Sequence, residues 1–273
     1  VIARSTGTFS AFSYGLYLYY NQGDLKIEQN TVHTVGRYAM YCYGGNFSNF
    51  GKGSISNNMF GANFLSTSGT AYGMYLYNCK DIDFFHNSVD MGGTSARTVY
   101  VAGSSSDSLR FVNNIFSAGG TYPGQGGHAF YTAFANGIQQ MDHNMYYSNG
   151  AQLIYWNGPS YTDLAAFQTG VPGFNANSIE DAPGFISQTN LHLVCSPADD
   201  LGAPVGVMVD RDDQSRSATT PDIGADEFTG ISVTTSLGPD VSTCDLYKLY
   251  GDTIGFESFV WNGSSTGDFM NIT

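Results

Sequence analysis

Short runs of alternating apolar and polar residues recur along the first half of the chain, and Gly, Ser or Asn residues bound each run. A period of two is typical of a half-buried β-strand, because successive side chains of a strand point to opposite faces of its sheet. The repeated segments contain no run with the apolar period of an amphipathic helix. The pattern predicts one strand in each of residues 14–19, 38–43, 72–77, 98–102 and 129–133.

A second short apolar run follows each of these strands, and an asparagine follows that run. The intervals between the asparagines are 28, 29, 27 and 30 residues, for Asn30, Asn58, Asn87, Asn114 and Asn144. A period near 28 residues with two or three short strands predicts one coil of a parallel β-solenoid per repeat. Equivalent residues then stack about 4.8 Å apart along the axis. The asparagine amides are expected to form a ladder, bonding to one another and to the turn backbone.

Alternation also assigns a side to each position of the first strand. Tyr14 falls on the inner face, together with two aliphatic rows: Leu16, Met40, Met74, Val99 and Phe130, and Leu18, Cys42, Leu76, Val101 and Thr132. The outer face carries a row of Tyr17, Tyr41, Tyr75, Tyr100 and Tyr131, and a second row of Tyr19, Tyr43 and Tyr77. Regularly spaced aromatic rings offer a platform for sugar rings, so the five tyrosines of the longer row are the candidate glycan-binding residues. The alternative is that the rings only stack on one another or lie under another domain.

The N-[NSTM]-[VFI] turns, repeated after short β runs, resemble those of bacterial right-handed parallel β-helix repeat proteins over residues 1–228. Residues 160–170 read as a short helix, with the capping pattern S-x-x-D at Ser160 and Asp163. The LHL-x-SPA, D-x-D-x-x-x-R and PDIGA-E segments that follow resemble the C-terminal end of the same proteins, where they finish the last coils. The positions that match are Asp210, Asp212, Arg216, Asp222 and Glu227.

The last part of the chain, residues 229–273, has a different composition. Its LGPDVSTC, FVWNGS and TGDFMNIT segments resemble the start of immunoglobulin-like modules of surface proteins exported by the type IX secretion route. Such modules need about 80–100 residues, so the resemblance implies a partial module. Cys244 would normally pair with a cysteine near the module's end. The resemblance therefore implies an all-β chain, a β-helix followed by the start of an Ig-like sandwich, in a longer bacterial protein that is extracellular or at the cell surface.

Charge and hydropathy narrow the possible partners. The chain of 273 residues has a net charge of −13, and nucleic acid is excluded because its binding needs a basic face. The sequence contains no run of eighteen apolar residues, so membrane insertion is not expected. The expected partners are carbohydrate, a cell-surface molecule or further domains of the same polypeptide.

Candidate catalytic groups are few. Glycoside hydrolysis needs two carboxyl groups across one bond, and Asp81 and Asp83 are the best pair because they are expected to point the same way on one strand. Lys80 beside them is a candidate base for a lyase. The alternative, which we favour, is an exposed strand start with solvated carboxylates. His86 and His143 each precede a ladder asparagine, which favours a role in the turn over metal ligation.

Calcium is the one cofactor that the sequence suggests, at Asp210, Asp212 and Asp213, although none is required. The favoured alternative is an ion-paired turn in which Asp210 or Asp222 pairs with Arg216. The leading hypothesis is a non-catalytic adhesin or scaffold that contacts glycans or surfaces. The alternatives are a polysaccharide lyase or glycoside hydrolase acting in the β-helix groove through Lys80, Asp81 and Asp83, and a structural spacer of a larger surface protein.

Overall fold

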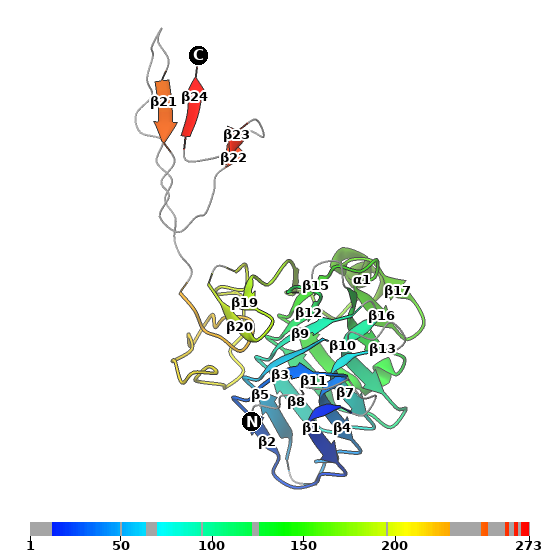
Figure 1. Cartoon of the computed structure of the whole chain (residues 1–273). Coiled ribbons are helices and arrows are strands. Elements are labelled where there is room, and N and C mark those ends of the chain that lie inside the picture. Colours follow the sequence, from blue (N-terminus) through cyan, green and yellow to red (C-terminus); the bar gives the residue numbers. More distant parts are fainter. Residues whose placement is uncertain are drawn as a thin grey trace. The chain divides into compact units, whose positions relative to one another are not determined.

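The computed structural model describes residues 13–49, 51–63, 70–93, 95–121, 126–194 and 196–229, and four short strands further on. The chain divides into two compact units, Val1–Thr229 and Gly230–Thr273. The first unit is an all-β parallel solenoid, as predicted (Figure 1). No helix in the described residues is long and apolar enough to cross a membrane.

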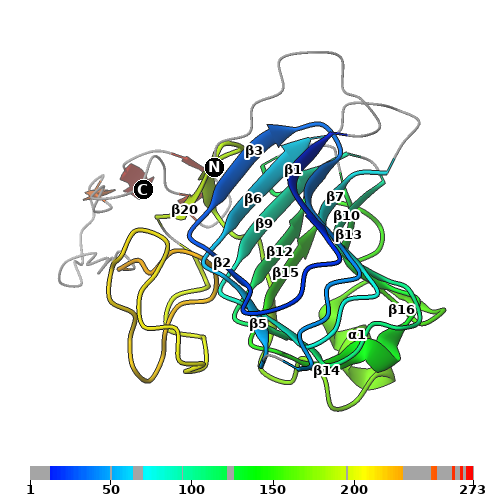
Figure 2. The ribbon, with the colours of Figure 1, turned by 90° about the horizontal axis from the view of Figure 1, so that it is seen from below.

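Three parallel sheets form the walls of the solenoid, and each coil contributes one strand to each sheet. Sheet A contains β1 (Tyr14–Tyr19), β4 (Tyr38–Tyr43), β7 (Tyr72–Tyr77), β10 (Ala96–Ala102), β13 (Gly127–Thr132) and β16 (Ile154–Trp156), with β17 (Ser160–Tyr161) antiparallel at its end. Sheet B contains β2 (Lys26–Glu28), β5 (Gly53–Ser56), β8 (Ile82–Phe85), β11 (Leu109–Val112) and β14 (Ile138–Asp142). Sheet C contains β3 (Thr31–Val35), β6 (Met59–Asn63), β9 (Ser88–Gly92), β12 (Ile115–Ala118), β15 (Met145–Ser148) and β18 (Ile179–Glu180) (Figure 2).

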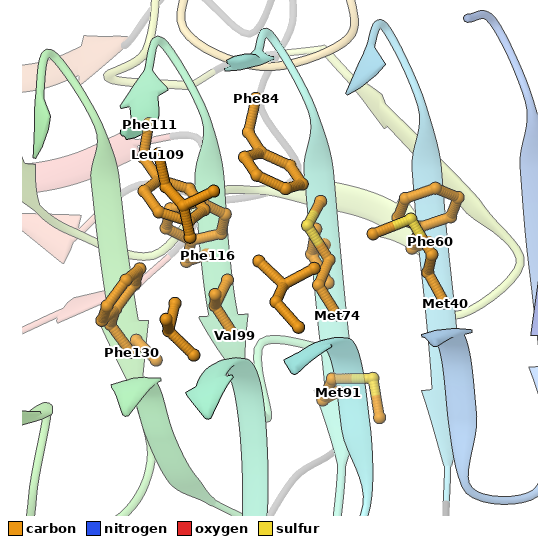
Figure 3. Packing of buried hydrophobic residues seen from close by; sticks show 14 of the residues in the cluster. Met40, Phe60, Met74, Phe84, Met91, Val99, Leu109, Phe111, Phe116 and Phe130 are labelled. Atoms are coloured by element: carbon orange, nitrogen blue, oxygen red, sulfur yellow. The ribbon is translucent and has the colours of Figure 1, made fainter. Parts of the chain in front are cut away.

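The core lies inside the three sheets, and the predicted inner rows are confirmed. Met40, Met74, Val99 and Phe130 have no exposed surface, and each is in register with the next along sheet A. Phenylalanines from sheets B and C pack against them (Figure 3). Each such side chain contributes about 1.5–3 kcal/mol to stability by leaving water. Cys42 is also buried here, and its Sγ lies 3.2 Å from that of Cys79.

The prediction that Tyr14 points inward is wrong. The Tyr14 ring lies 5.0 Å from the ring of outward-facing Tyr17, and Tyr72 meets Tyr75 in the same way at 5.1 Å. The reason is a break in the alternation at the glycine that follows each tyrosine. A Cβ on Gly73 would lie 2.4 Å from Val89 Cγ1, so this position faces the core next to inward-facing Met74. Two consecutive inward positions shift the phase by one residue and turn the preceding tyrosine outward.

The turn between sheets B and C has two equivalent positions in every coil. The first residue has a positive φ of 51–60°, and it is Gln29, Asn57, His86, Asn113 or His143. The second is the ladder asparagine, whose Nδ2 donates to the Oδ1 of the asparagine one coil further on at 2.9–3.0 Å. The same Oδ1 accepts a backbone N–H. The left-handed conformation is one that short polar residues tolerate, which explains the histidines at these positions.

The second half closes the solenoid with less regular structure. The helix expected at 160–170 is α1 (Leu164–Gly170), and it buries Leu164 and Phe167. Its N-cap is Asp163, whose carboxylate accepts from the N–H of Ala166 at 2.7 Å. Ser160, expected to take part in the cap, lies in β17 instead. The remaining elements of this unit are η1 (Ala135–Gly137) and the antiparallel pair β19 (Phe185–Ser187) and β20 (Asn190–Leu193).

Residues 196–229, here called the closing segment, do not finish the last coil as expected. They run along the side of the solenoid and bond to the left-handed turn residues of four coils (Figure 2). Gln29 and Asn57 donate to the carbonyls of Asp210 and Val209, and Asn113 donates to that of Ala203. The reason is that a stacked row of polar turn side chains needs partners, which an irregular backbone supplies.

The second unit contains two antiparallel pairs in its described residues, β21 (Tyr247–Tyr250) with β24 (Phe269–Ile272), and β22 (Val260–Trp261) with β23 (Ser265–Thr266). Cys195 and Cys244 lie outside the described residues.

Candidate functional site

The outer face of sheet A carries a continuous array of tyrosines, here called the tyrosine face. Its longest row runs through six strands and contains the five predicted residues Tyr17, Tyr41, Tyr75, Tyr100 and Tyr131, followed by Tyr155. Rows of three lie on either side of it: Tyr14, Tyr38 and Tyr72, and Tyr19, Tyr43 and Tyr77. The parallel register of the sheet places every ring next to its equivalent one coil away, so the structure brings all five predicted residues together.

The rings pack on each other in two different ways. Tyr17, Tyr41 and Tyr75 are stacked, with centroids 5.3 and 4.9 Å apart and planes within 9° of parallel. From Tyr75 to Tyr100 and on to Tyr131 the rings meet edge to face, at 80° and 81°. Stacked rings cover one another's faces, so this part of the array presents ring edges and hydroxyl groups outward. A partner would contact mainly phenol O–H groups and C–H edges there.

Exposure is greatest where the array begins. Tyr17, Tyr19 and Tyr20 are 53–56% exposed, whereas Tyr41, Tyr75 and Tyr100 are half-buried by their neighbours. Burial raises the pKa of Tyr41 to about 12, and burial raises that of Tyr75 as well. These two phenols therefore stay neutral at physiological pH, and each keeps a proton to donate.

The row that begins with Tyr14, Tyr38 and Tyr72 continues in later coils with basic residues in place of tyrosine. Tyr72 is in register with Arg97, and Arg97 with His128, so a basic pair continues a row of tyrosines. The Arg97 guanidinium lies 3.7 Å from the Tyr131 ring centroid and 4.8 Å from that of Tyr100, which is a cation–π arrangement. No carboxylate pairs with Arg97 in the described part of the chain.

A cavity of about 350 Å³ lies at this polar end of the row. Arg97, His128 and Gln152 line it, together with small residues of the neighbouring turns. Two of its polar atoms, His128 Nε2 and Gln152 Oε1, are buried and have no hydrogen-bond partner. Burial, aided by the Arg97 charge, lowers the pKa of His128, so its imidazole is neutral at pH 7. Unpartnered buried polar atoms are costly, and a bound polar molecule would satisfy these two.

The structure separates the candidate catalytic residues. Asp81 lies outside β8, at a positive φ of 54°, and accepts from Ser48 Oγ at 2.5 Å. Asp83 lies within β8 and is held by both Nε and Nη2 of Arg110, the former at 2.6 Å. Lys52 Nζ is a further 3.6 Å from Asp83. Lys80 pairs through its backbone with neighbouring coils. The two carboxylates therefore have different partners, and the expected shared strand does not include Asp81.

A second groove, of about 340 Å³, lies between the outer face of sheet B and residues 205–209 of the closing segment. Lys26, Glu28 and Asp83 are its charged residues. The carboxylate of Asp83 is thus at the groove, and Nε and Nη2 of Arg110 donate to its two oxygens.

The three calcium candidates also have separate partners. Asp210 is fully buried and accepts the backbone N–H groups of Asp212, Gln214 and Glu227. Asp213 accepts from Gln29, and Asp212 contacts His192 and Arg211. The structure does not gather these three aspartates around one point.

In the expected ion-paired turn, the carboxylate that pairs with Arg216 is not one of the two predicted. Arg216 forms its salt bridge with Glu227 at 2.9 Å, and it also donates to Asn57 Oδ1 at 2.9 Å. Asp222 accepts the N–H groups of Asp200 and Phe228 instead. The carboxylates of Asp210 and Asp222 organise the backbone of the closing segment, which leaves Glu227 to neutralise Arg216.

Comparison of the chain with known protein families, with curated proteins and with solved structures finds no match. Sequence reasoning missed Arg97, His128 and Gln152, although their signal was present. Each stands two residues before an inward apolar residue of sheet A, namely Val99, Phe130 or Ile154, at the offset that Tyr72 has from Met74.

Proposed function

We propose that the protein is a non-catalytic, secreted or cell-surface β-helix protein, an adhesin or scaffold that contacts glycans through the tyrosine face. The observation that carries the proposal is the continuous row from Tyr17 to Tyr155, which ends beside a cavity with two unpartnered polar atoms. Phenol hydroxyls can bond to sugar hydroxyls, and ring edges can pack against the apolar sides of sugar rings.

The finer structural part of the proposal is that the solenoid is right-handed. Crossovers between parallel strands are right-handed in about 98% of cases. We further propose that the second unit begins an immunoglobulin-like module of the kind exported by the type IX route, supported by its LGPDVSTC and TGDFMNIT segments. A bacterial extracellular or cell-surface location follows from that resemblance.

The test is binding of the purified chain to a panel of neutral and acidic polysaccharides, with and without Ca²⁺. The double variant Tyr41→Ala/Tyr75→Ala removes two of the three stacked rings. It is expected to weaken binding about 5- to 150-fold, because each aromatic contact is worth about 0.5–1.5 kcal/mol. The matched control is Tyr147→Ala on sheet C, away from the tyrosine face, which should bind normally. Equal binding by the double variant and the wild type would overturn the proposal.

A polysaccharide lyase or hydrolase is the second candidate, favoured by the groove at Asp83. New reducing ends or unsaturated products in the same samples, lost in Asp83→Asn, would establish cleavage and displace the adhesin proposal. If the chain neither binds nor cleaves any glycan of the panel, the hypothesis of a structural spacer in a larger surface protein is favoured.

A further inference from the structure

Three side chains of the last part of the first unit converge, although they are far apart in the sequence. His192 comes from β20, Asp212 from the turn that follows Asp210, and Asp226 from the PDIGADEF stretch. One ligand atom of each lies within 4.8 Å of the others. Asp226 is 4% exposed, whereas the His192 and Asp212 side chains are 31% and 38% exposed. The cluster therefore has a fixed inner ligand and an open side toward solvent.

The hydrogen bonds of His192 define which of its nitrogens is free. Its Nδ1 contacts Oδ1 of Asn190, and an amide oxygen can only accept, so this assignment places the ring proton on Nδ1. Nε2 lies 2.5 Å from Oδ2 of Asp212. In a neutral ring these two atoms are both acceptors, and their approach needs a positive charge between or beside them. Metal-ligating histidines characteristically donate the other ring N–H to an oxygen in this way.

The carboxylates are arranged in a compatible manner. Asp212 uses Oδ1 for the Arg211 guanidinium at 3.0 Å, which leaves Oδ2 on the side of His192. Asp226 uses Oδ2 for the N–H of Leu193 at 2.7 Å, a bond that fixes its orientation. Asp226 has no cationic side chain in ion-pair contact within the described residues. A buried carboxylate without a paired cation is costly, and a bound ion would balance it.

We propose that His192, Asp212 and Asp226 form a binding site for a divalent first-row transition-metal ion such as Zn²⁺, with water completing its coordination. An imidazole with two carboxylates suits these ions, whereas Ca²⁺ and Mg²⁺ prefer oxygen ligands alone. The site is separate from the tyrosine face, and it differs from the predicted calcium cluster, of which only Asp212 takes part.

The competing account is a simple ion pair between protonated His192 and Asp212. It explains the short contact of Nε2, but among the described residues it leaves the buried carboxylate of Asp226 with the N–H of Leu193 and no cation in ion-pair contact. The two accounts differ in whether Zn²⁺ binds with defined stoichiometry.

The experiment uses the full chain, dialysed against a chelator and then titrated with Zn²⁺ by calorimetry, with Ca²⁺ in a parallel titration. One Zn²⁺ is expected to bind per chain, more tightly than Ca²⁺, and to raise the melting temperature. His192→Asn and Asp226→Asn should each weaken Zn²⁺ binding at least about 10-fold, since both remove a direct ligand. The Asp226→Asn substitution keeps an amide oxygen that can still accept the Leu193 N–H.

The matched control is His143→Asn. His143 Nδ1 lies 3.3 Å from one carboxylate, that of Asp142, and asparagine occupies the equivalent turn position in other coils. This variant should bind Zn²⁺ like the wild type. If Asp226→Asn does not fold by circular dichroism, the more exposed Asp212→Asn takes its place. Absence of stoichiometric Zn²⁺ binding, or unchanged binding in the His192 variant, would overturn the proposal in favour of the ion pair.

Discussion

At the scale of single residues, the asparagine ladder shows how a buried polar group is accommodated inside a stacked fold. Asn87 has no exposed surface, and its Nδ2 donates to Asn114 Oδ1 and to the carbonyls of Ile55 and Phe85. Its Oδ1 accepts both the N–H and the Nδ2 of Asn58. One side chain thus serves three coils, and no other small residue offers two donors and an acceptor in this geometry.

Asn87→Ala should therefore destabilise the first unit by at least about 3 kcal/mol, because it leaves several buried groups without partners and each costs about 1–3 kcal/mol. The control is Asn30→Ala, at the partly exposed start of the ladder, where water can replace the lost bonds. Denaturant unfolding of both variants measures the difference. Equal losses at the two positions would contradict a role for burial in the ladder.

Arg216 is the buried cation of the closing segment, with its side chain 1% exposed. It bonds to Glu227, to Asn57 and to the carbonyl of Gly224. Arg216→Ala leaves the Glu227 carboxylate unpaired and is expected to cost about 3–5 kcal/mol. Arg211→Ala, a partly exposed neighbour, should cost less than about 1 kcal/mol. Thermal and denaturant melts of the two variants provide the comparison.

At the scale of elements, sheet A couples the ionisation of its tyrosines to folding. The pKa of Tyr41 is about 12 in the folded chain against an ordinary value of 10.0, chiefly through burial and then through its neighbouring phenols. A group whose pKa is raised by folding stabilises the protein fully below its unfolded pKa, and this contribution is lost as the pH rises through the folded value. Stability should therefore fall between about pH 10 and 12.

Tyr41→Phe isolates this effect, because it removes the ionisable hydroxyl and keeps the ring in its stack. The variant should lose less stability than the wild type over that pH range, and ultraviolet titration should show one fewer late-ionising tyrosine. Tyr147→Phe, on sheet C and away from the tyrosine face, is the control and should leave the late-ionising tyrosines unchanged. An identical alkaline profile for Tyr41→Phe and the wild type would contradict the coupling.

The same sheet shows how far the sequence predicts the site. The repeat and its period predict the strands, the inner rows and the outward row of Tyr17, because these follow from local alternation. Alternation predicts the wrong side for Tyr14 because Gly15 faces inward beside Leu16. The inward position of Gly15 depends on the close approach of another sheet. The placement of Asp81 is also not predicted. Its own left-handed conformation keeps it out of the strand that contains Asp83. The convergence of His192 with Asp226 depends on the path of an irregular segment, which no periodicity encodes.

At the scale of the whole first unit, the closing segment joins coils that are otherwise linked only to their neighbours. In a solenoid each coil contacts the next, so stability is normally a sum of local terms. Here residues 196–229 bond to Gln29, Asn57, His86 and Asn113, which belong to four coils. The segment should therefore make unfolding of these coils more cooperative.

Asp222 provides a pH test of this arrangement. Burial raises its pKa to about 6 from 3.8, so its contribution to stability is complete below about pH 4 and is lost as the pH rises through 6. As the pH rises over this range, the unfolding free energy of the wild type should fall relative to that of Asp222→Asn. Comparing the two proteins at each pH removes the contribution of the other carboxylates, and a constant difference from pH 4 to 7 would contradict the assignment.

The most direct test of the closing segment is its removal. A chain that ends at Thr229 keeps the whole first unit and serves as the reference. A chain that ends at Val194 loses the partners of the four turn residues and also buried Ile223, which packs on Ile115 and Met145. Burial of one such side chain is worth about 1.5–3 kcal/mol, so the loss should exceed about 3 kcal/mol and broaden the transition. If both truncated chains unfold alike, the solenoid is stable without this segment, and the bonds to its turns contribute little.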